Sequence, residues 1–536
     1  MSRHLDQSPR LCERAERPLH FAPAFAPSTL AKLLIVLSLI FLTTTPAHAH
    51  LGSKDIFEQV TAGPYNLFIT IRPPVVIPGV ATVEVRATGA PITTLSITPT
   101  PLTGEAANHP PTPDILVRSA SDPSFYTGGV WMMASGSWQV RFTIDGPQGH
   151  QSTSIPVPAM ALSTLKMQRD LGIPLALLGL FLVVTMAGLV AAAIRESRLP
   201  PGATPTPTLR RRGLIAMALS LVVMAIAIYY GGVWWKVDAA DYAEDIYRPL
   251  SVDAHLTGDL LDLNVHPFRP ASPDDRFARS ARSNTDFLPD HGHLMHLYAI
   301  REPEMDAVFH LHPALNPTKP GDFAMPLPPM PPGTYKLYGD VVHANGFPET
   351  LVTTLTVPAS LPVAPSPSSP ASSPPSNPDD AFALPPPLSA GPLGPVYKLP
   401  DGYTLVWDKP ATLTATTPYS FHFHLLAPDG TPARDATPYM GMAGHAAFIK
   451  TDGTVFAHTH PEGSAAMAAL DLANKDSGMS MSSGSSMDSM SSTPSTAISP
   501  SVDFPYGFPT PGSYRIVIQM KHSSTIETAV FDATVQ

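Results

Sequence analysis

Two long apolar runs constrain this chain of 536 residues more than any other feature. They span Gly172–Ile194 and Gly213–Trp235, and each is long enough to cross a bilayer as one helix of about 20 residues. The loop between them, residues 195–212, carries five arginines against a single acid, Glu196. The positive-inside rule places such a loop in the cytoplasm. We therefore expect a two-helix transmembrane hairpin whose flanking regions both lie outside the cytoplasmic membrane.

Residues 1–49 are expected to be an N-terminal extension that ends in a secretory signal peptide. Lys32 precedes an apolar stretch, and Ala47–Ala49 fits a small-x-small cleavage site. An uncleaved anchor helix is the alternative. Cleavage after Ala49 would give His50 a free α-amine beside its imidazole, a pair that copper proteins use as a histidine brace. His109 or His150 would then supply the further ligand that a brace needs.

The three segments outside the membrane runs carry the alternation of β-strands. Tyr65–Ile71 (YNLFITI), for example, places an apolar residue at every second position, and Pro and Gly mark turns between such runs. Short alternating strands of this kind predict antiparallel β-sandwiches of immunoglobulin or cupredoxin type. We therefore expect a mainly β chain with three such modules: the first module, residues 50–165, the second module, residues 240–357, and the third module, residues 396–536.

Two low-complexity segments interrupt this organisation. Residues 358–395 are rich in Pro and Ser and are expected to form an extended spacer between the second and third modules, because they lack the residues of a packed core. Lys475–Ser499 is rich in Ser and is expected to be a disordered loop. Core packing does not explain its methionines, whereas capture of a soft metal does. These are Met479, Met481, Met487 and Met490.

Composition excludes several classes of site. The only cysteine is Cys12, so the rest of the chain has no disulfide framework, no thiolate metal site and no blue-copper centre. A formal net charge of −10 gives no reason to expect a nucleic-acid partner. Because the chain shows no catalytic nucleophile, phosphate loop or clear acid–base pair, we do not expect an enzyme.

A histidine constellation occurs twice with nearly the same spacing, once in the second module and once in the third. Imidazole is the commonest side-chain ligand for metals in proteins, so the repeat predicts up to two metal sites, one per module. The alternative is a set of buried imidazoles that bond to one another or to Asp286 and Asp435. The matched pairs are His296 and His445, His310 and His458, His312 and His460, and His343 and His522.

The spacing within each constellation suits a β-strand. His310 and His312 are two residues apart, as are His458 and His460, and alternate side chains of an extended strand share a face. His343 ends a strand whose alternate residues are apolar, and it is expected to lie at the edge of a core. His422 and His424 in FHFHLL also share a strand face, for which a solvated surface is the alternative.

Differences between the two copies indicate the metal. His291 and His293 of the second module correspond to Met440 and Met442 of the third, with a glycine between the two residues in each copy. Exchange of imidazole for thioether suits copper, because Cu(I) accepts soft sulfur and both oxidation states accept imidazole. Zinc, which rarely uses Met, is the alternative.

Three segments carry a family resemblance: PGTYKLYGDV in the second module, PGSYRIVIQM in the third and GSWQVRFTID in the first. With the predicted mature His50, they resemble the YtkA-like and copper-resistance CopC-like β-sandwiches of bacteria. The resemblance covers the three modules but not the membrane hairpin. It implies periplasmic copper binding and hand-over, at the outer side of the bacterial inner membrane, with a metal transporter or a cuproprotein as partner.

Together these patterns predict a membrane-anchored periplasmic protein that binds copper for sequestration, delivery or resistance. Two alternatives stay open. One is an extracytoplasmic interaction or adhesion protein whose histidine clusters are structural. The other is an enzyme or assembly factor that uses a histidine-ligated copper. Coordination number, and whether the two modules bind metal separately or share one ion, also stay open.

Overall fold

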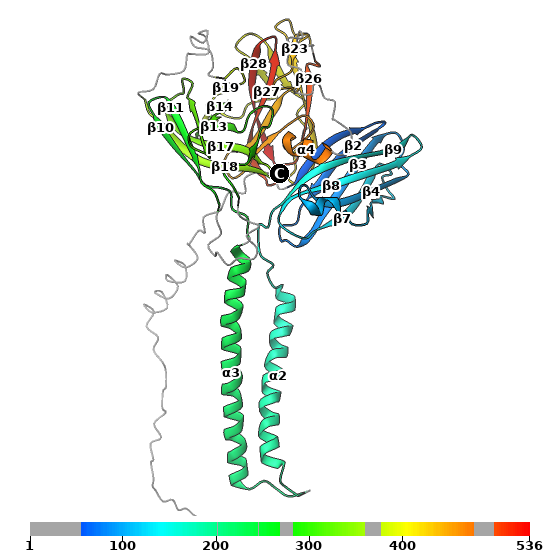
Figure 1. Cartoon of the computed structure of the whole chain (residues 1–536), viewed down its shortest axis with the longest axis vertical. Helices are drawn as coiled ribbons and strands as arrows, with labels where there is room; N and C mark the ends of the chain where they lie inside the picture. Colours follow the sequence, from blue (N-terminus) through cyan, green and yellow to red (C-terminus); the bar gives the residue numbers. More distant parts are fainter. Residues whose placement is uncertain (1–54, 201, 245, 269–281, 360–376, 476–497) are drawn as a thin grey trace, which may run out of the picture. The chain divides into compact units, whose positions relative to one another are not determined.

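The structure is a computed structural model that describes residues 55–200, 202–244, 246–268, 282–359, 377–475 and 498–536. Within these residues the chain is mainly β, with six antiparallel sheets and three α-helices (Figure 1). The predicted signal, His50, residues 360–376 of the predicted spacer and the methionine-bearing loop lie outside the described residues.

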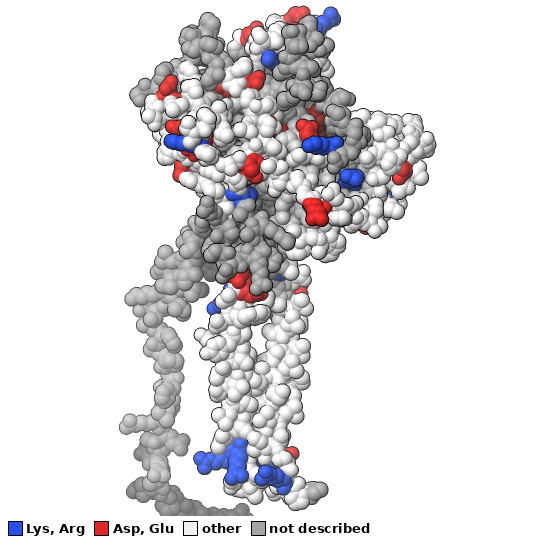
Figure 2. Space-filling view, viewed as in Figure 1, with Lys and Arg blue, Asp and Glu red and all other residues white. Residues whose placement is uncertain are grey.

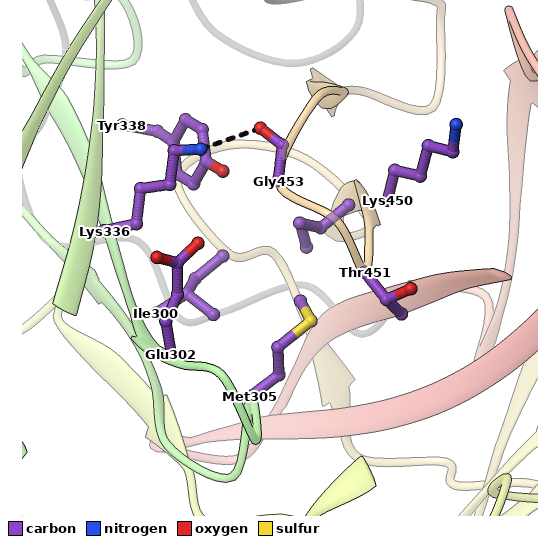
Figure 3. A pocket seen from close by; sticks show the side chains of 9 residues that line it. Ile300, Glu302, Met305, Lys336, Tyr338, Lys450, Thr451 and Gly453 are labelled. Atoms are coloured by element: carbon purple, nitrogen blue, oxygen red, sulfur yellow. Dashed lines mark hydrogen bonds between the residues drawn. The ribbon is translucent and has the colours of Figure 1, made fainter. Parts of the chain in front are cut away.

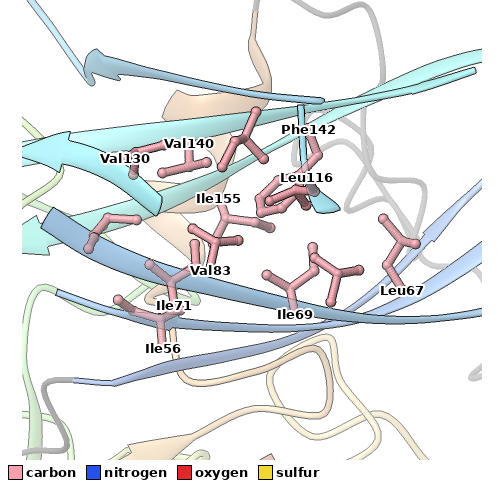
Figure 4. Close-up of a cluster of buried hydrophobic side chains, with 14 of the residues drawn as sticks. Ile56, Leu67, Ile69, Ile71, Val83, Leu116, Val130, Val140, Phe142 and Ile155 are labelled. Carbon is pink, nitrogen blue, oxygen red and sulfur yellow. The ribbon is translucent and has the colours of Figure 1, made fainter. Parts of the chain in front are cut away.

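The first module folds as two antiparallel sheets around one core. Strand β2 shows why: Leu67, Ile69 and Ile71 alternate along it and are all buried, as alternation requires of a half-buried strand. Figure 4 shows these side chains meeting Val140, Phe142 and Ile155 of the other sheet. One sheet contains β1 (Ile56–Ala62), β2 (Tyr65–Arg72), β3 (Gly79–Gly89), β7 (Phe125–Met132) and β6 (Val117–Arg118); the other contains β5 (Asp114–Ile115), β4 (Thr94–Pro101), β8 (Gly136–Gly146) and β9 (Gly149–Ala159). A 3₁₀ turn, η1, spans Glu105–Asn108.

Helices α2 (Arg169–Glu196) and α3 (Pro207–Glu244) contain the two predicted membrane runs and pack against each other (Figure 1). Both are long and apolar enough to cross a membrane. Only 6% of the most apolar window of each helix is buried, which is not the burial of a core helix. Figure 2 shows basic side chains gathered where α2 ends and α3 begins, as the arginine-rich loop predicts.

The second and third modules each consist of two antiparallel sheets, and their larger sheets have the same strand order, except that the second module's sheet has one more strand at its edge. In the second module the smaller sheet is β10 (Val252–Thr257), β11 (Leu260–Val265), β16 (Asp322–Pro326) and β15 (Ala314–Leu315), and the larger is β12 (Phe287–Leu288), β17 (Gly333–His343), β13 (His296–Glu302), β14 (Val308–Leu311) and β19 (Ala381–Ala383), with β18 (Pro348–Val357) also on β17. In the third module the smaller sheet is β20 (Val396–Lys398), β21 (Thr404–Trp407), β22 (Tyr419–Leu426) and β26 (Ser501–Tyr506), and the larger is β23 (Ala436–Thr437), β27 (Gly512–His522), β24 (His445–Lys450) and β25 (Phe456–Thr459), with β28 (Thr525–Val535) also on β27. The repeat seen in the sequence is therefore a repeat of structure.

Part of the predicted spacer is ordered and belongs to the second module's larger sheet. Strand β19 pairs with β14, so that Ala381 lies opposite His310, and a 3₁₀ turn, η3 (Leu388–Ala390), follows. A short helix that the sequence did not indicate, α4 (Met467–Asn474), follows the second His-x-His strand. Its Ala468 N–H donates to the Asp290 carboxylate at 2.8 Å, and its Asn474 bonds Ser154 of β9. Helix α4 thus ties the first module to the turn that carries His291.

The larger sheets of the second and third modules pack against each other through matching residues. Tyr298 and Ile300 of β13 meet Phe456, Ile449 and the rest of a cluster to which both modules contribute the same sheet positions. Tyr338 stacks on Phe456 with ring centroids 4.3 Å apart. Such a contact, in which the same patch of each copy faces the other, has the character of a two-fold interface. The corresponding pairs are Tyr298 and Ala447, Ile300 and Ile449, Val308 and Phe456, Tyr338 and Val517, and Val352 and Val530.

Cationic side chains at one edge of this interface repeat the same relation. Figure 3 shows Lys336 of β17 reaching the Gly453 carbonyl of the third module, at 2.8 Å, beside a small pocket that Met305 also lines. Its counterpart on β27, Arg515, donates to the Met305 carbonyl of the second module, also at 2.8 Å. Each module therefore gives one cation to a loop carbonyl of the other.

Candidate metal centre

Eight histidines gather at one end of this interface, six of them on or next to strands of the two larger sheets and two, His291 and His293, in a turn. The predicted sharing of a strand face holds: the ring centroids of His310 and His312 are 4.6 Å apart, and those of His458 and His460 are 4.8 Å apart. His296 and His445 begin the neighbouring strands β13 and β24. The full set is His291, His293, His296, His310, His312, His445, His458 and His460.

The two constellations adjoin and form one cluster. The ring of His296 lies 5.4 Å from that of His458, and the ring of His310 lies 6.2 Å from that of His445, centroid to centroid. His291 lies close to histidines of the other module: its ring centroid is 4.8 Å from that of His460 and 5.2 Å from that of His445. The sequence predicted one site per module. The structure brings both sets to a shared centre in which His291 joins the third module's group.

A tight turn positions His291 and His293, and the third module builds the same turn with methionine. His291 and Gly292 have φ of 50° and 86°, and Met440 and Gly441 have φ of 48° and 82°. Positive φ at both central residues defines a type I′ turn. The backbone N–H of Asp290 donates to the His293 carbonyl at 2.8 Å. Tyr439 and Met442 make the corresponding bond, also at 2.8 Å, in the third module.

The cluster holds buried ring nitrogens that bond to nothing else in the described part of the chain. His445 is fully buried, and neither of its nitrogens has a hydrogen-bond partner. Buried polar atoms without partners are rare in native proteins, and a bound ion is one explanation for them. The donor atoms also converge, because the ligand nitrogens of His291, His445 and His460, and those of His296, His310 and His312, lie within 4.8 Å of one another in each group. The other unpartnered atoms are Nε2 of His291, His312 and His458 and both nitrogens of His460.

Burial holds most of these imidazoles in the neutral form that metal binding requires. Burial lowers the pKa of His296, His310, His445 and His460 well below the usual value, and neighbouring histidines lower it further. The pKa values of His291 and His312 are lowered for the same first reason, burial.

Carboxylates and amides orient the rings from behind. His312 Nδ1 lies 3.1 Å from the Asp380 carboxylate, which leaves Nε2 directed into the cluster. A carboxylate that holds the far nitrogen of a histidine is the usual second partner of a metal-bound imidazole. His310 Nδ1 lies 2.8 Å from the Gln519 amide oxygen, and Tyr298 stacks flat on the His310 ring with centroids 4.2 Å apart.

His343 and His522 lie outside the cluster, on the opposite faces of the same sheets. Strand β13 pairs so that His296 faces Asp340 on β17. Asp340 and His343 are three residues apart, and residues of opposite parity on a strand point to opposite faces. His343 lies between Asp286 and Glu349, with nitrogen–oxygen distances of 2.9 Å to each. These bonds outweigh burial and raise the pKa of His343.

The remaining candidates are placed separately. Met442 is buried and Met440 half-buried in the turn that matches His291 and His293. His422 and His424 pair with Asp503 and Asp408 on a partly exposed face of β22, at 2.8 Å and 2.9 Å. His50 lies outside the described residues. Of its suggested partners, His109 ends the exposed turn η1 and His150 pairs with Asp145 on the surface.

Sequence reasoning missed Tyr298, Gln519 and Asp380, which enclose or orient the cluster. Tyr298 carried a usable signal, because it is two residues after His296 and so shares its face of the strand. No pattern in the sequence indicated Asp380, because it lies in a segment whose composition indicates a spacer. Gln519 can be assigned to the site only from the strand register, which places it opposite His445.

Comparison with known proteins adds one match of sequence. A family model described as a domain of unknown function (DUF8832) matches residues 264–359 and 397–536, so one model covers the second and third modules together. No curated protein matches. Among solved structures, a chain of a 1.5-MDa bacterial ice-binding adhesin is similar over 86% of this chain and 91% of its own, with 6% identity and a TM-score of 0.14. Escherichia coli alpha-2-macroglobulin activated by porcine elastase is similar over 88% of this chain and 30% of its own, with 8% identity and a TM-score of 0.17. TM-scores this low carry no argument about fold or function.

Proposed function

We propose that the chain is a membrane-anchored protein that binds copper at the histidine cluster between its second and third modules. The observation that carries this proposal is the set of buried, unpartnered imidazole nitrogens from both modules. A structural role alone accounts poorly for them, because leaving a buried polar atom without a hydrogen bond costs about 1–3 kcal/mol. An ion that accepts several of these lone pairs removes that cost.

The donor set favours copper over zinc. Imidazole nitrogens suit both metals, but the two thioethers that replace His291 and His293 in the third module suit Cu(I). The described cluster offers imidazole nitrogens and no thiolate, and the methionines lie in the adjoining turn of the third module. We expect such a site to hold the ion for sequestration or delivery to a transporter or cuproprotein.

The same proposal covers fold type and location. The paired antiparallel sheets of each module support an immunoglobulin- or cupredoxin-like assignment, of the kind found in YtkA-like and CopC-like proteins. The apolar pair α2 and α3, with its basic connecting loop, supports a hairpin in the bacterial inner membrane with the modules on the periplasmic side.

Metal retention by purified protein tests the proposal. We expect the full-length chain in detergent to retain copper after dialysis, measured by elemental analysis in separate loadings with Cu(I), Cu(II) and Zn(II). The variant His458→Ala/His460→Ala should lose at least half of that copper. The matched control is His422→Ala/His424→Ala, which removes another His-x-His pair from a strand outside the interface.

Two outcomes would contradict the proposal. Equal copper retention by the parent and by His458→Ala/His460→Ala would place the metal elsewhere. Absence of retained metal in a folded parent would instead support the alternative in which the imidazoles are structural. Greater retention of zinc than of copper would keep the site and change the metal.

A further inference from the structure

The fourth matched histidine of each repeat lies in its own cluster of carboxylates, away from the proposed copper centre. In the second module His343 contacts Asp286 and Glu349. Glu349 is fully buried at its side chain, and a cation compensates its charge: the Arg282 guanidinium lies 3.4 Å away. Tyr247 O–H and the Leu250 N–H also donate to Glu349, at 3.0 Å and 2.9 Å. The guanidinium and these hydrogen bonds together compensate the buried charge of Glu349.

The third module repeats the cluster without the cation. His522 corresponds to His343, Asp435 to Asp286, and Glu527 to Glu349, since both glutamates occupy the same position in their hairpins. A third carboxylate, Asp401, joins them at 2.9 Å from His522 Nε2. Among the described residues no lysine or arginine lies within ion-pairing distance of these three carboxylates, and each of them pairs with His522 instead.

We propose that a divalent cation of the zinc or manganese class binds to His522, Glu527 and Asp401, where it replaces the charge that Arg282 supplies in the second module. The three donor atoms lie within 4.8 Å of one another. His522 Nε2 is 2.9 Å from Asp401 and 3.4 Å from Glu527. Two ligands of a tetrahedral zinc ion, each about 2.1 Å from the metal, lie about 3.4 Å apart. The observed spacing is therefore close to that of a ligand set.

One further observation points to a ligand rather than to a chance cluster. His522 is only 5% exposed, and its Nδ1 has no hydrogen bond but faces Asp435 at 3.5 Å. A metal-bound histidine usually donates its far N–H to a carboxylate, and Asp435 is the carboxylate next to that nitrogen of His522.

The site differs from the copper centre in chemistry and in access. Its donors are carboxylate oxygens and one imidazole, which favour harder divalent ions, and it has no thioether for Cu(I). The side chains of Asp401 and Asp435 are 34% and 41% exposed, so an ion can reach the site from solvent. Tyr403 covers the other side by stacking on His522 with centroids 3.8 Å apart.

Zinc stoichiometry of the full-length protein in detergent tests this site. We expect Asp401→Asn/Glu527→Gln to bind one equivalent of Zn²⁺ less than the parent in equilibrium dialysis. It should also lose part of the rise in Tm that Zn²⁺ gives the parent. The matched control, Asp286→Asn, alters the corresponding cluster of the second module and should keep the parent's zinc count. Repeating the comparison in the His458→Ala/His460→Ala background separates this ion from any metal in the histidine cluster.

A second variant supplies the cation as the second module does. Asp401→Arg should also lose one equivalent of Zn²⁺, while its Tm in chelator should equal or exceed that of the parent. The proposal is overturned if Asp401→Asn/Glu527→Gln keeps the full zinc count. It is equally overturned if that variant lowers Tm by the same amount with and without Zn²⁺, because the cluster would then be only a hydrogen-bond network.

Discussion

At the scale of single residues, the two nitrogens of each histidine decide what that histidine can do. His312 has one nitrogen held by Asp380 and one left without a partner inside the cluster, whereas His343 has both nitrogens occupied by carboxylates. In the sequence the two histidines look equivalent, because both belong to the same repeated pattern. Their difference comes from which neighbours the fold brings to the second nitrogen.

Asp380 is expected to act on the metal through His312. The variant Asp380→Asn should weaken copper affinity by about 10–100-fold, because it removes the carboxylate that orients the ring and raises its basicity. Competition titration against a copper chelator measures the change. Asp408→Asn, which alters a similar carboxylate–histidine pair on the surface of the third module, should leave affinity unchanged. Unchanged affinity in Asp380→Asn would contradict the orienting role.

The buried imidazoles also predict how stability of the metal-free protein depends on pH. Six of them have pKa values lowered below the unfolded value of about 6.5, first of all by burial. The unfolded chain therefore binds more protons as pH falls, and stability present above pH 6.5 is lost below it. Each such group removes up to about 1.4 kcal/mol of unfolding free energy per pH unit. His343, with its raised pKa, acts in the opposite direction but is a single group.

Thermal melts in chelator test this dependence. We expect a steep fall of Tm between pH 7 and pH 5 in the parent and in the control His422→Ala/His424→Ala. A Tm that stays level across that range would show that the cluster is not buried in its neutral form.

At the scale of elements, alternation and spacing predicted much of the fold and part of the site. Apolar length indicated α2 and α3, and strict alternation indicated strands such as β2. The two-residue spacing placed His310 beside His312. Sequence could not place His343, because its face follows from the pairing of β13 with β17. It also could not reveal the ordered end of the spacer, since β19 owes its place to hydrogen bonds with β14 rather than to its own composition.

The type I′ turns are expected to depend on their glycines. Gly292→Ala should lower the unfolding free energy by about 1–2 kcal/mol, because an added Cβ disfavours its φ of 86°. The cost is purely conformational, since nothing lies within 4 Å of the site of that Cβ. Gly394→Ala is the control, at a glycine with equally open surroundings and no positive φ. Equal Tm values for the two variants would contradict the turn assignment.

At the scale of the whole molecule, the second and third modules act as one unit because their larger sheets cover each other. Each larger sheet turns one face toward the other module, and that face is buried rather than exposed to solvent. Tyr298, Tyr338 and Phe456 are buried there. The proposed metal centre lies at the end of that same interface. Composition alone could not show this, because each module also reads as a complete two-sheet unit.

Phe456 is the side chain on which that interface is expected to depend most. It is fully buried and stacks on Tyr338. Phe456→Ala should destabilise the protein by about 3–5 kcal/mol, as is usual for a buried phenylalanine. Differential scanning calorimetry measures the effect, with Phe382→Ala, at a phenylalanine that is 46% exposed on β19, as the control. Copper retention should fall in Phe456→Ala but not in Phe382→Ala.

The matching patches between the two modules have a consequence for how such a chain can diversify. Two identical subunits that met through this interface would have to carry every substitution twice, once on each side of the axis. In a tandem chain each side changes alone, so one turn can keep His291 while the other carries Met440. Tyr298 can likewise face the imidazoles on one side while Ala447 holds the equivalent place. Because the two modules are covalently linked, their site residues can differ while the contact surface between the modules is kept.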